Sequence, residues 1–186
     1  MYLVISMRVI SGIYKGKNLL GFDIDGTRPT MDRIKESMFA MIQDYIEDSI
    51  CLDLFSGSGS LGIEAISNGA KTTYFVDNGI EVLKVLKNNL KGIKEEYKVL
   101  ETDYNKALKY FKENNIKFDL IILDPPYHRL FINKILDYII DNNLLNDNGI
   151  VVCEYEEEKV DNKVLKVLKE KKYGTKSVRV YIFDNK

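Results

Sequence analysis

The most informative chemistry in this sequence lies in one short segment, Asp124-Pro125-Pro126-Tyr127. It directly follows the apolar run Phe118 to Leu123, which predicts a central strand, and ligand chemistry in open α/β sheets concentrates at the carboxyl ends of strands. Two successive prolines keep the backbone extended and remove two amide donors, so carbonyl groups are left to accept hydrogen bonds. Taken alone, the same tetrapeptide is also typical of a plain surface turn.

Acceptors at this position suit the transfer of a methyl group to the exocyclic amine of a nucleobase. The amine lone pair is delocalised into the ring, so it attacks poorly until acceptors draw the nitrogen toward tetrahedral geometry. We expect the Asp124 carboxylate and the Pro125 carbonyl to bind one amine hydrogen each and to help remove the proton. Tyr127 would stack on the base. His128, the single histidine, is more typical of a cleft edge than of a general base.

A second motif, the glycine-rich segment Ser56 to Gly62, predicts a nucleotide-type cofactor. It lies between the strand predicted at Ile50 to Phe55 and a helix, so Gly57 and Gly59 would form a tight turn with bare backbone against a ligand. The helix N-terminus favours an anionic group there. Asp77 closes the next strand about 20 residues later and would accept hydrogen bonds from ribose hydroxyls. These features suit NAD and S-adenosylmethionine alike.

Two further aspartates favour S-adenosylmethionine. Asp53 stands two residues before the turn, where its charge would repel a pyrophosphate but attract a cofactor that carries an ammonium and a sulfonium group. Asp103 follows the third predicted strand, Tyr97 to Glu101, in position to accept a hydrogen bond from an adenine amine. Each aspartate alone fits a turn or a helix cap equally well.

The elements that must position these residues alternate between short apolar runs and amphipathic helical stretches, which is typical of an α/β doubly wound fold with a mostly parallel sheet. The other strands are predicted at Thr72–Val76 and Gly149–Cys153, and the helices at Ser60–Asn68, Ile80–Lys91, Asn105–Asn114 and Leu130–Asn142. At the end of the chain, Val164–Lys171 and Val178–Phe183 flank a Tyr173-Gly174 turn and predict an antiparallel hairpin.

The first part of the chain predicts an extension of this core. Arg8–Ser11 and Lys17–Leu20 indicate a small hairpin, and Thr30 or Asp32 would cap a helix with apolar positions from Ile34 to Tyr45. We expect a single domain spanning 1–186, in which 7–46 form the hairpin-and-helix extension and 47–186 form a Rossmann-like catalytic core.

Composition narrows the class of protein further. Charged residues nearly cancel to a net charge of -1, so nucleic-acid binding would rest on a local patch or be absent. Cys51 and Cys153 lie in apolar strands and predict buried thiols rather than a metal site. No apolar run is long enough for a membrane span, and a cytoplasmic location is expected. The candidate patch consists of basic residues and one aromatic residue: Arg8, Tyr14, Lys15, Lys17, Arg28, Arg33 and Lys35. Acidic residues lie near them in the sequence, so a plain solvated surface also fits this region.

The motifs together resemble the RsmD family, a group of class I S-adenosylmethionine-dependent methyltransferases of the amino-methylating type. Besides Asp124 to Tyr127, the resemblance rests on Met7 to Gly12, on Thr27 to Arg33 with Lys35-Glu36-Ser37, and on Asp53 to Gly62. It covers nearly the whole chain from Met7. It implies a seven-stranded sheet with an antiparallel last strand, and methylation of a guanine amine in small-subunit ribosomal RNA.

The resemblance also implies a role for each matching residue. Asp124, Pro125, Pro126 and Tyr127 would hold the target base. Arg28 and Thr30 would bind either the methionine carboxylate of the cofactor or an RNA phosphate, and the sequence does not decide between them. The cofactor contacts would come from Asp53, Phe55, Gly57, Gly59, Asp77 and Asp103.

The expected partner is therefore ribosomal RNA or an assembling small ribosomal subunit, with an unpaired guanine as the target, because the base must leave any helical stack to reach the methyl group. We expect a monomer without metal and without membrane contact. Three other functions stay open: a DNA adenine or cytosine amino-methyltransferase, an NAD-dependent oxidoreductase that uses the same glycine loop, and a catalytically silent RNA-binding scaffold.

Overall fold

The computed structural model describes residues 6–22, 28–125, 132–156 and 164–183. Of the predicted site residues, Pro126 and Tyr127 lie outside these ranges, as does His128, and for Arg28 and Thr30 only the backbone is described.

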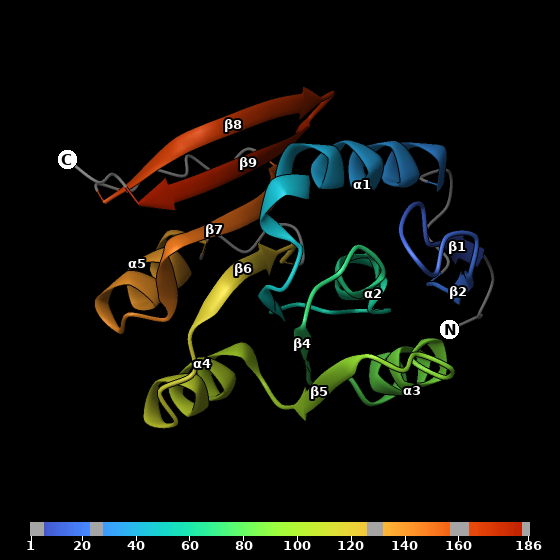
Figure 1. Ribbon diagram of the computed structural model, residues 1–186, viewed down its shortest axis with the longest axis horizontal. Helices are drawn as coiled ribbons and strands as arrows, with labels where there is room; N and C mark the ends of the chain where they lie inside the picture. Colours follow the sequence, from blue (N-terminus) through green and yellow to red (C-terminus); the bar gives the residue numbers. More distant parts are fainter. Residues whose placement is uncertain (1–5, 23–27, 126–131, 157–163, 184–186) are drawn as a thin grey trace.

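A seven-stranded sheet forms the centre of the protein (Figure 1). Its strand order is β5-β4-β3-β6-β7-β9-β8. Neighbouring strands from β5 to β7 run parallel, whereas β9 runs antiparallel to both β7 and β8, which confirms the predicted antiparallel last strand. The strands are β3 (Ile50–Asp53), β4 (Thr72–Asp77), β5 (Glu96–Glu101), β6 (Phe118–Leu123), β7 (Leu145–Glu156), β8 (Leu165–Tyr173) and β9 (Lys176–Phe183).

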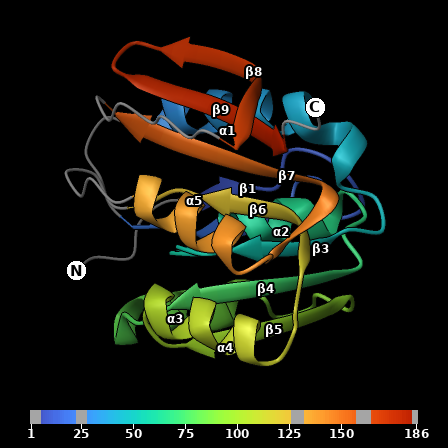
Figure 2. The same cartoon turned by 90° about the vertical axis from the view of Figure 1, so that its left-hand side faces the viewer.

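Helices cover both faces of this sheet, as the alternating pattern predicts (Figures 1 and 2). One face is covered by α1 (Arg28–Ile42), α2 (Ser60–Ser67) and α3 (Ile80–Asn89), and the other by α4 (Tyr104–Glu113) and α5 (Ile132–Asp141). A short 3₁₀ helix, η1 (Gln43–Tyr45), follows α1. None of the helices in the described part of the chain has the length and apolar character needed to cross a membrane.

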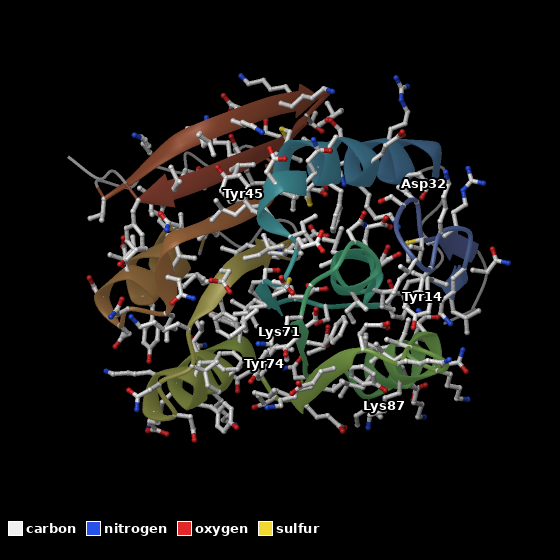
Figure 3. All side chains as sticks on the ribbon, in the orientation of Figure 1. Tyr14, Asp32, Tyr45, Lys71, Tyr74 and Lys87 are labelled. Atoms are coloured by element: carbon white, nitrogen blue, oxygen red, sulfur yellow. The ribbon has the colours of Figure 1, made fainter. Side chains whose placement is uncertain are left out.

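Aromatic packing fills the layer between the sheet and α4. The Tyr74 ring, labelled in Figure 3, lies 5.4 Å from the ring of Phe111 and 5.5 Å from that of Phe118, both edge to face. Such contacts add to the free energy gained by burying the rings. Both cysteines are free and buried in the strands where the sequence places them.

Helix α1 packs on the carboxyl-terminal strands and begins earlier than predicted. Val178 and Val180 on β9 are fully buried against it. Lys169 Nζ on β8 donates to the Met41 carbonyl, 2.7 Å away in the last turn of α1, where cations are favoured. The prediction of a cap at Thr30 or Asp32 was wrong, since the helix already begins at Arg28 and includes Pro29, which the first turn of a helix tolerates.

The N-terminal hairpin consists of β1 (Ser6–Arg8) and β2 (Asn18–Leu20). The prediction that the first strand continues to Ser11 was wrong. The main-chain amides of Ile10 and Ser11 donate instead to the buried carboxylate of Glu64 on α2, at 2.9 and 2.8 Å. A buried carboxylate needs such donors, so the chain leaves the hairpin to supply them.

Lys35 and Tyr14, both members of the candidate RNA patch, also make contacts that stabilise the fold. Lys35 is buried, and its Nζ donates to the Arg8 carbonyl at 2.7 Å and lies 3.3 Å from Glu64 Oε2. The prediction that Lys35 belongs to a surface patch was therefore wrong. The Tyr14 hydroxyl donates to Glu95 Oε2 at 2.6 Å and accepts from the Lys94 amide, which fastens the hairpin segment to the chain between α3 and β5 (Figure 3).

Candidate functional site

The carboxyl ends of the parallel strands meet at one edge of the sheet and carry acidic side chains, four of which form the candidate site. In Figure 2 the arrowheads of β4, β6 and β7 point toward the same side. Asp53 ends β3, Asp77 ends β4, Asp124 follows β6, and Glu154 lies near the end of β7. Since β3 pairs with both β4 and β6, the predicted cofactor and base residues stand on neighbouring strands.

The glycine loop between β3 and α2 adopts the turn that its sequence predicts. Gly57 and Gly59 have positive φ angles of 53° and 82°. A side chain at Gly59 would overlap Leu86 of α3, and one at Gly62 would overlap the ring of Phe75. Glycine at these positions therefore lets the loop turn sharply and lets α2 pack closely, leaving main-chain atoms on the ligand side.

Asp53 is almost fully buried and holds the start of α2. Its Oδ2 accepts the Gly62 amide at 2.9 Å, whereas its Oδ1 has no hydrogen-bond partner among the described residues. Burial, reinforced by the Asp77 charge and only partly offset by the Gly62 amide, raises the pKa of the Asp53 carboxyl to about 7. An acceptor atom without a partner in such a place fits the ammonium group of an amino-acid-bearing cofactor.

Asp77 links the glycine loop to the next strand. Its Oδ2 accepts the Gly57 amide at 3.0 Å, and its Oδ1 accepts the Gly79 amide at 2.9 Å. The carboxylate therefore lies within hydrogen-bond distance of the loop, at the position where ribose hydroxyls would be bound. Its spacing from Gly57 was the signal that located it in the sequence.

Asp103 is the N-cap of α4. Its Oδ1 accepts the main-chain amides of Asn105 at 3.0 Å and Lys106 at 3.1 Å. The Lys106 amide in particular holds the pKa of the Asp103 carboxyl below its ordinary value. The cap was one of the two roles open from the sequence, and the adenine contact stays a prediction. Beside it, Phe55 packs on Tyr104 with ring centroids 5.4 Å apart.

Asp124 directly follows β6 and is affected by the charges of Glu154 and Asp53. It is partly buried, and Pro125 is buried. Burial, together with the charges of Glu154 and Asp53, raises the pKa of Asp124 well above its ordinary value, and the cation of Lys176 partly opposes this. Within the described ranges, no three His, Cys, Asp or Glu side chains are arranged to hold a metal ion.

Glu154 and Lys176 belong to this site although the sequence reasoning did not select them. Lys176 Nζ lies 2.9 Å from Glu154 Oε1. Glu154 directly follows the predicted strand Gly149–Cys153, just as Asp124 directly follows the predicted strand Phe118–Leu123. This matching position could have marked Glu154 as a site residue from the sequence. Lys176 had none, because its position depends on how β9 pairs with β7.

Comparison with known proteins identifies the family. A family model described as "Conserved hypothetical protein 95" matches residues 7–182. The chain is 36% identical over 179 residues to "Ribosomal RNA small subunit methyltransferase D" of Haemophilus influenzae, covering 94% of this chain and 93% of that protein. The chain belongs to the RsmD family. The RsmD protein of Escherichia coli is 31% identical over 153 residues, which cover 82% of this chain and 76% of its own.

Solved structures support the RsmD fold. "Putative methyltransferase yhhF from Escherichia coli" superposes with a TM-score of 0.82 at 27% identity, covering 97% of this chain and 99% of its own. "Putative methylase HI0767" from Haemophilus influenzae gives a TM-score of 0.77 at 34% identity, covering 95% and 97%. A more distant structure, "SMU.776, a putative methyltransferase complexed with SAH", shares the fold with a TM-score of 0.68 at 15% identity. The match covers 90% of this chain and 52% of that one.

Proposed function

We propose that this protein transfers a methyl group from S-adenosylmethionine to the exocyclic N2 amine of a guanine in small-subunit ribosomal RNA. One observation carries the proposal: Asp124 directly follows β6, and β6 pairs with β3, the strand that leads into the glycine loop. A cofactor on that loop and a base held at Asp124 would therefore be neighbours at the same edge of the sheet. Membership of the RsmD family supports ribosomal RNA as the substrate class.

The charge of the cofactor pocket supports S-adenosylmethionine as the donor. The Asp53 Oδ1 atom would accept a hydrogen bond from the ammonium group. The Asp77 carboxylate would accept hydrogen bonds from the ribose hydroxyls, either in place of the one from the Gly57 amide or in addition to it. A pyrophosphate would instead be brought near a buried carboxyl group and a second aspartate, which disfavours NAD. The bound cofactor supplies an electrophilic methyl group at its sulfonium.

Residues of this chain would prepare the amine for attack. The Asp124 carboxylate and the Pro125 carbonyl each accept one amine hydrogen, so the nitrogen lone pair is free to form a bond to the methyl carbon. The cofactor would give up its methyl group and would leave as neutral S-adenosylhomocysteine, which keeps the electron pair of the broken methyl–sulfur bond. The amine then carries a positive charge, and one proton leaves it for Asp124 and from there for solvent.

RNA contact is proposed for the N-terminal extension. Three exposed cations lie on this extension: Arg8 on β1, Lys15 between β1 and β2, and Arg33 on α1. These cations suit the phosphate backbone, which positions a nucleic acid without reading its sequence. An unpaired guanine would enter the site at the lowest cost in free energy, because a paired guanine must first unpair and leave its helical stack.

A labelling experiment tests this function. The protein is incubated with methyl-labelled S-adenosylmethionine and with naked small-subunit RNA, partly assembled subunits or duplex DNA, and the labelled nucleotide is mapped. We expect N2-methylguanine in RNA. Label in DNA, or at another base, would contradict the proposal, and S-adenosylhomocysteine binding without any label would favour an RNA-binding scaffold. Calorimetric titration with NADH is the control, since tight NADH binding without S-adenosylhomocysteine binding indicates an oxidoreductase.

A further inference from the structure

Glu154 and Asp124 occupy equivalent positions on adjacent parallel strands. In the register of β6 and β7, Leu123 pairs with Cys153, so the next position of each strand brings Asp124 beside Glu154. Ile122 and Val152, two residues earlier, are both buried on the face that α1 covers. Because side chains alternate along a strand, Asp124 and Glu154 continue on that same face.

Lys176 reaches this pair from the antiparallel strand. It is the first residue of β9, and β9 runs opposite to β7, so the start of β9 lies at the edge where β6 and β7 end. Lys176 Nζ lies 2.9 Å from Glu154 Oε1, and the two side chains are only 19% and 10% exposed. An ion pair so poorly solvated is costly to build for stability alone, since exposed pairs of the same kind contribute little and buried ones lose hydration.

We propose that Glu154 and Lys176 are positioning residues that set the charge state of the Asp124 carboxyl group in opposite directions. This inference rests on the proposed function, because it assigns the pair to the residue that accepts the amine proton. It concerns residues whose charges act on Asp124, not residues that touch the base.

The charges around Asp124 influence the balance between its protonated and its ionised form. Asp53 faces it from β3, Glu154 from β7 and Lys176 from β9. On α1, the buried cation of Lys35 is bound to Glu64, the Arg8 carbonyl and Ser60 instead. Burial and the two carboxyl groups raise the pKa of Asp124, whereas Lys176 lowers it. Lys176 therefore favours the carboxylate form of Asp124, whereas Glu154 favours the protonated form and makes the carboxylate a stronger base.

Substitution of each partner should shift the pH dependence of methylation in opposite senses. Removing the cation in Lys176→Met raises the pKa of Asp124, so the acid limb of the kcat/KM profile moves to higher pH. Glu154→Gln removes a negative charge beside Asp124 while the positive charge of Lys176 stays, so the limb moves to lower pH. We expect about one pH unit in each direction, the usual effect of a neighbouring charge. A purely structural pair would lower activity without moving the limb.

Three further variants serve as controls for the pH profiles. Lys176→Arg keeps the cation and should keep the limb in place. The double variant Glu154→Gln with Lys176→Met removes both charges and should give a limb between those of the single variants. Lys172→Met removes a lysine four residues away whose side chain lies on the opposite face of the sheet, and it should leave the profile unchanged.

A titration without substrate separates this inference from the proposed function. The carboxyl carbons of the aspartates are labelled with carbon-13, and the Asp124 signal is assigned by its loss in Asp124→Asn. We expect the same opposite shifts in its titration midpoint, whether or not the RNA substrate has been identified. Shifts in the same direction, or none, in folded Lys176→Met and Glu154→Gln proteins would overturn the inference. Absence of methylation with the expected titration shifts would instead contradict the proposed function alone.

Discussion

The Nζ atom of Lys35 lies 3.3 Å from Oε2 of Glu64, and the two side chains are 6% and 0% exposed. The pair joins α1 to α2, and Glu64 also receives the amides of Ile10 and Ser11. Burial lowers the pKa of Lys35 despite the attraction of Glu64, so loss of hydration is the larger effect on the lysine. This buried ion pair is thus one of the contacts that hold the N-terminal extension on the core.

Breaking this pair should destabilise the protein. We expect Lys35→Met to lower the free energy of unfolding by about 3 kcal/mol or more, because it leaves Glu64 buried without its counter-charge. Lys84→Met removes a pair with Glu81 in which both side chains are 67% exposed, and it should cost less than about 1 kcal/mol. Urea denaturation of both variants checks the difference, and equal costs would contradict this role of the pair.

Gly12 and Gly16 form a matched pair for testing how the extension docks. Their φ angles are 77° and 86°, so alanine is strained at both, by about 1 kcal/mol. A side chain at Gly12 would also overlap the main-chain carbonyl of Ser67, whereas nothing lies within 4 Å of one at Gly16. We expect Gly12→Ala to cost about 2 kcal/mol more than Gly16→Ala, measured by thermal or urea unfolding. Similar losses would show that the Ser67 contact can yield.

Asp53 should release a proton when the cofactor binds. Its pKa of about 7 leaves the carboxyl mostly protonated at pH 6, and the ammonium of S-adenosylhomocysteine would favour the carboxylate. Calorimetric titration at pH 6 in buffers of different ionisation enthalpy should therefore show release of up to about one proton. Asp53→Asn should abolish it and weaken binding. Proton release unchanged in that variant would assign the effect to another group.

The same carboxyl group makes stability depend on pH. Because the pKa of Asp53 is raised in the folded state, the folded protein binds its proton more tightly, and stability falls as pH rises from about 4 to about 7. Asp53→Asn removes this dependence. Relative to the wild type, the variant should therefore gain stability between pH 5 and pH 8, by at most about 4 kcal/mol at roughly 1.4 kcal/mol per pKa unit.

Asp103 offers a test that separates a helix cap from a cofactor contact. Asp103→Ser keeps a side-chain acceptor for the start of α4 and removes the carboxylate, so we expect stability to change little. Affinity for S-adenosylhomocysteine should nevertheless fall about tenfold if the carboxylate accepts from adenine. Asp103→Ala removes both and should also lose about 1 kcal/mol of stability. Unchanged affinity in both variants would leave Asp103 as a cap alone.

Asp124→Ala should leave binding of S-adenosylhomocysteine nearly intact while lowering turnover by about 100-fold or more. The reason is that the residue accepts the amine rather than the cofactor, so its loss removes positioning and proton acceptance. Calorimetry and single-turnover methylation measure the two quantities separately. Wild-type turnover in this variant would remove Asp124 from the mechanism.

Much of the site was predictable because its signals are local. The glycine loop, Asp53 and Asp77 are recognisable from the order strand, turn and helix, and from the rule that parallel strands end at one edge. Asp124 follows from the same rule. Asp103 is recognisable as an acidic residue at a strand end, yet a helix cap and a ligand contact have the same local sequence, so its hydrogen bonds were needed to show the cap.

The amino-acid order alone therefore determined the αβ alternation, the turn at Gly57 and Gly59, and the acidic strand ends, because each depends on a few consecutive residues and their backbone preferences. Only the tertiary structure decided that Lys35 is buried against Glu64 and that Lys176 meets Glu154 beside Asp124. Those pairs join segments far apart in the chain, and their contacts depend on helix placement and strand direction. A charge in the sequence does not reveal whether water or an opposite charge will surround it after folding.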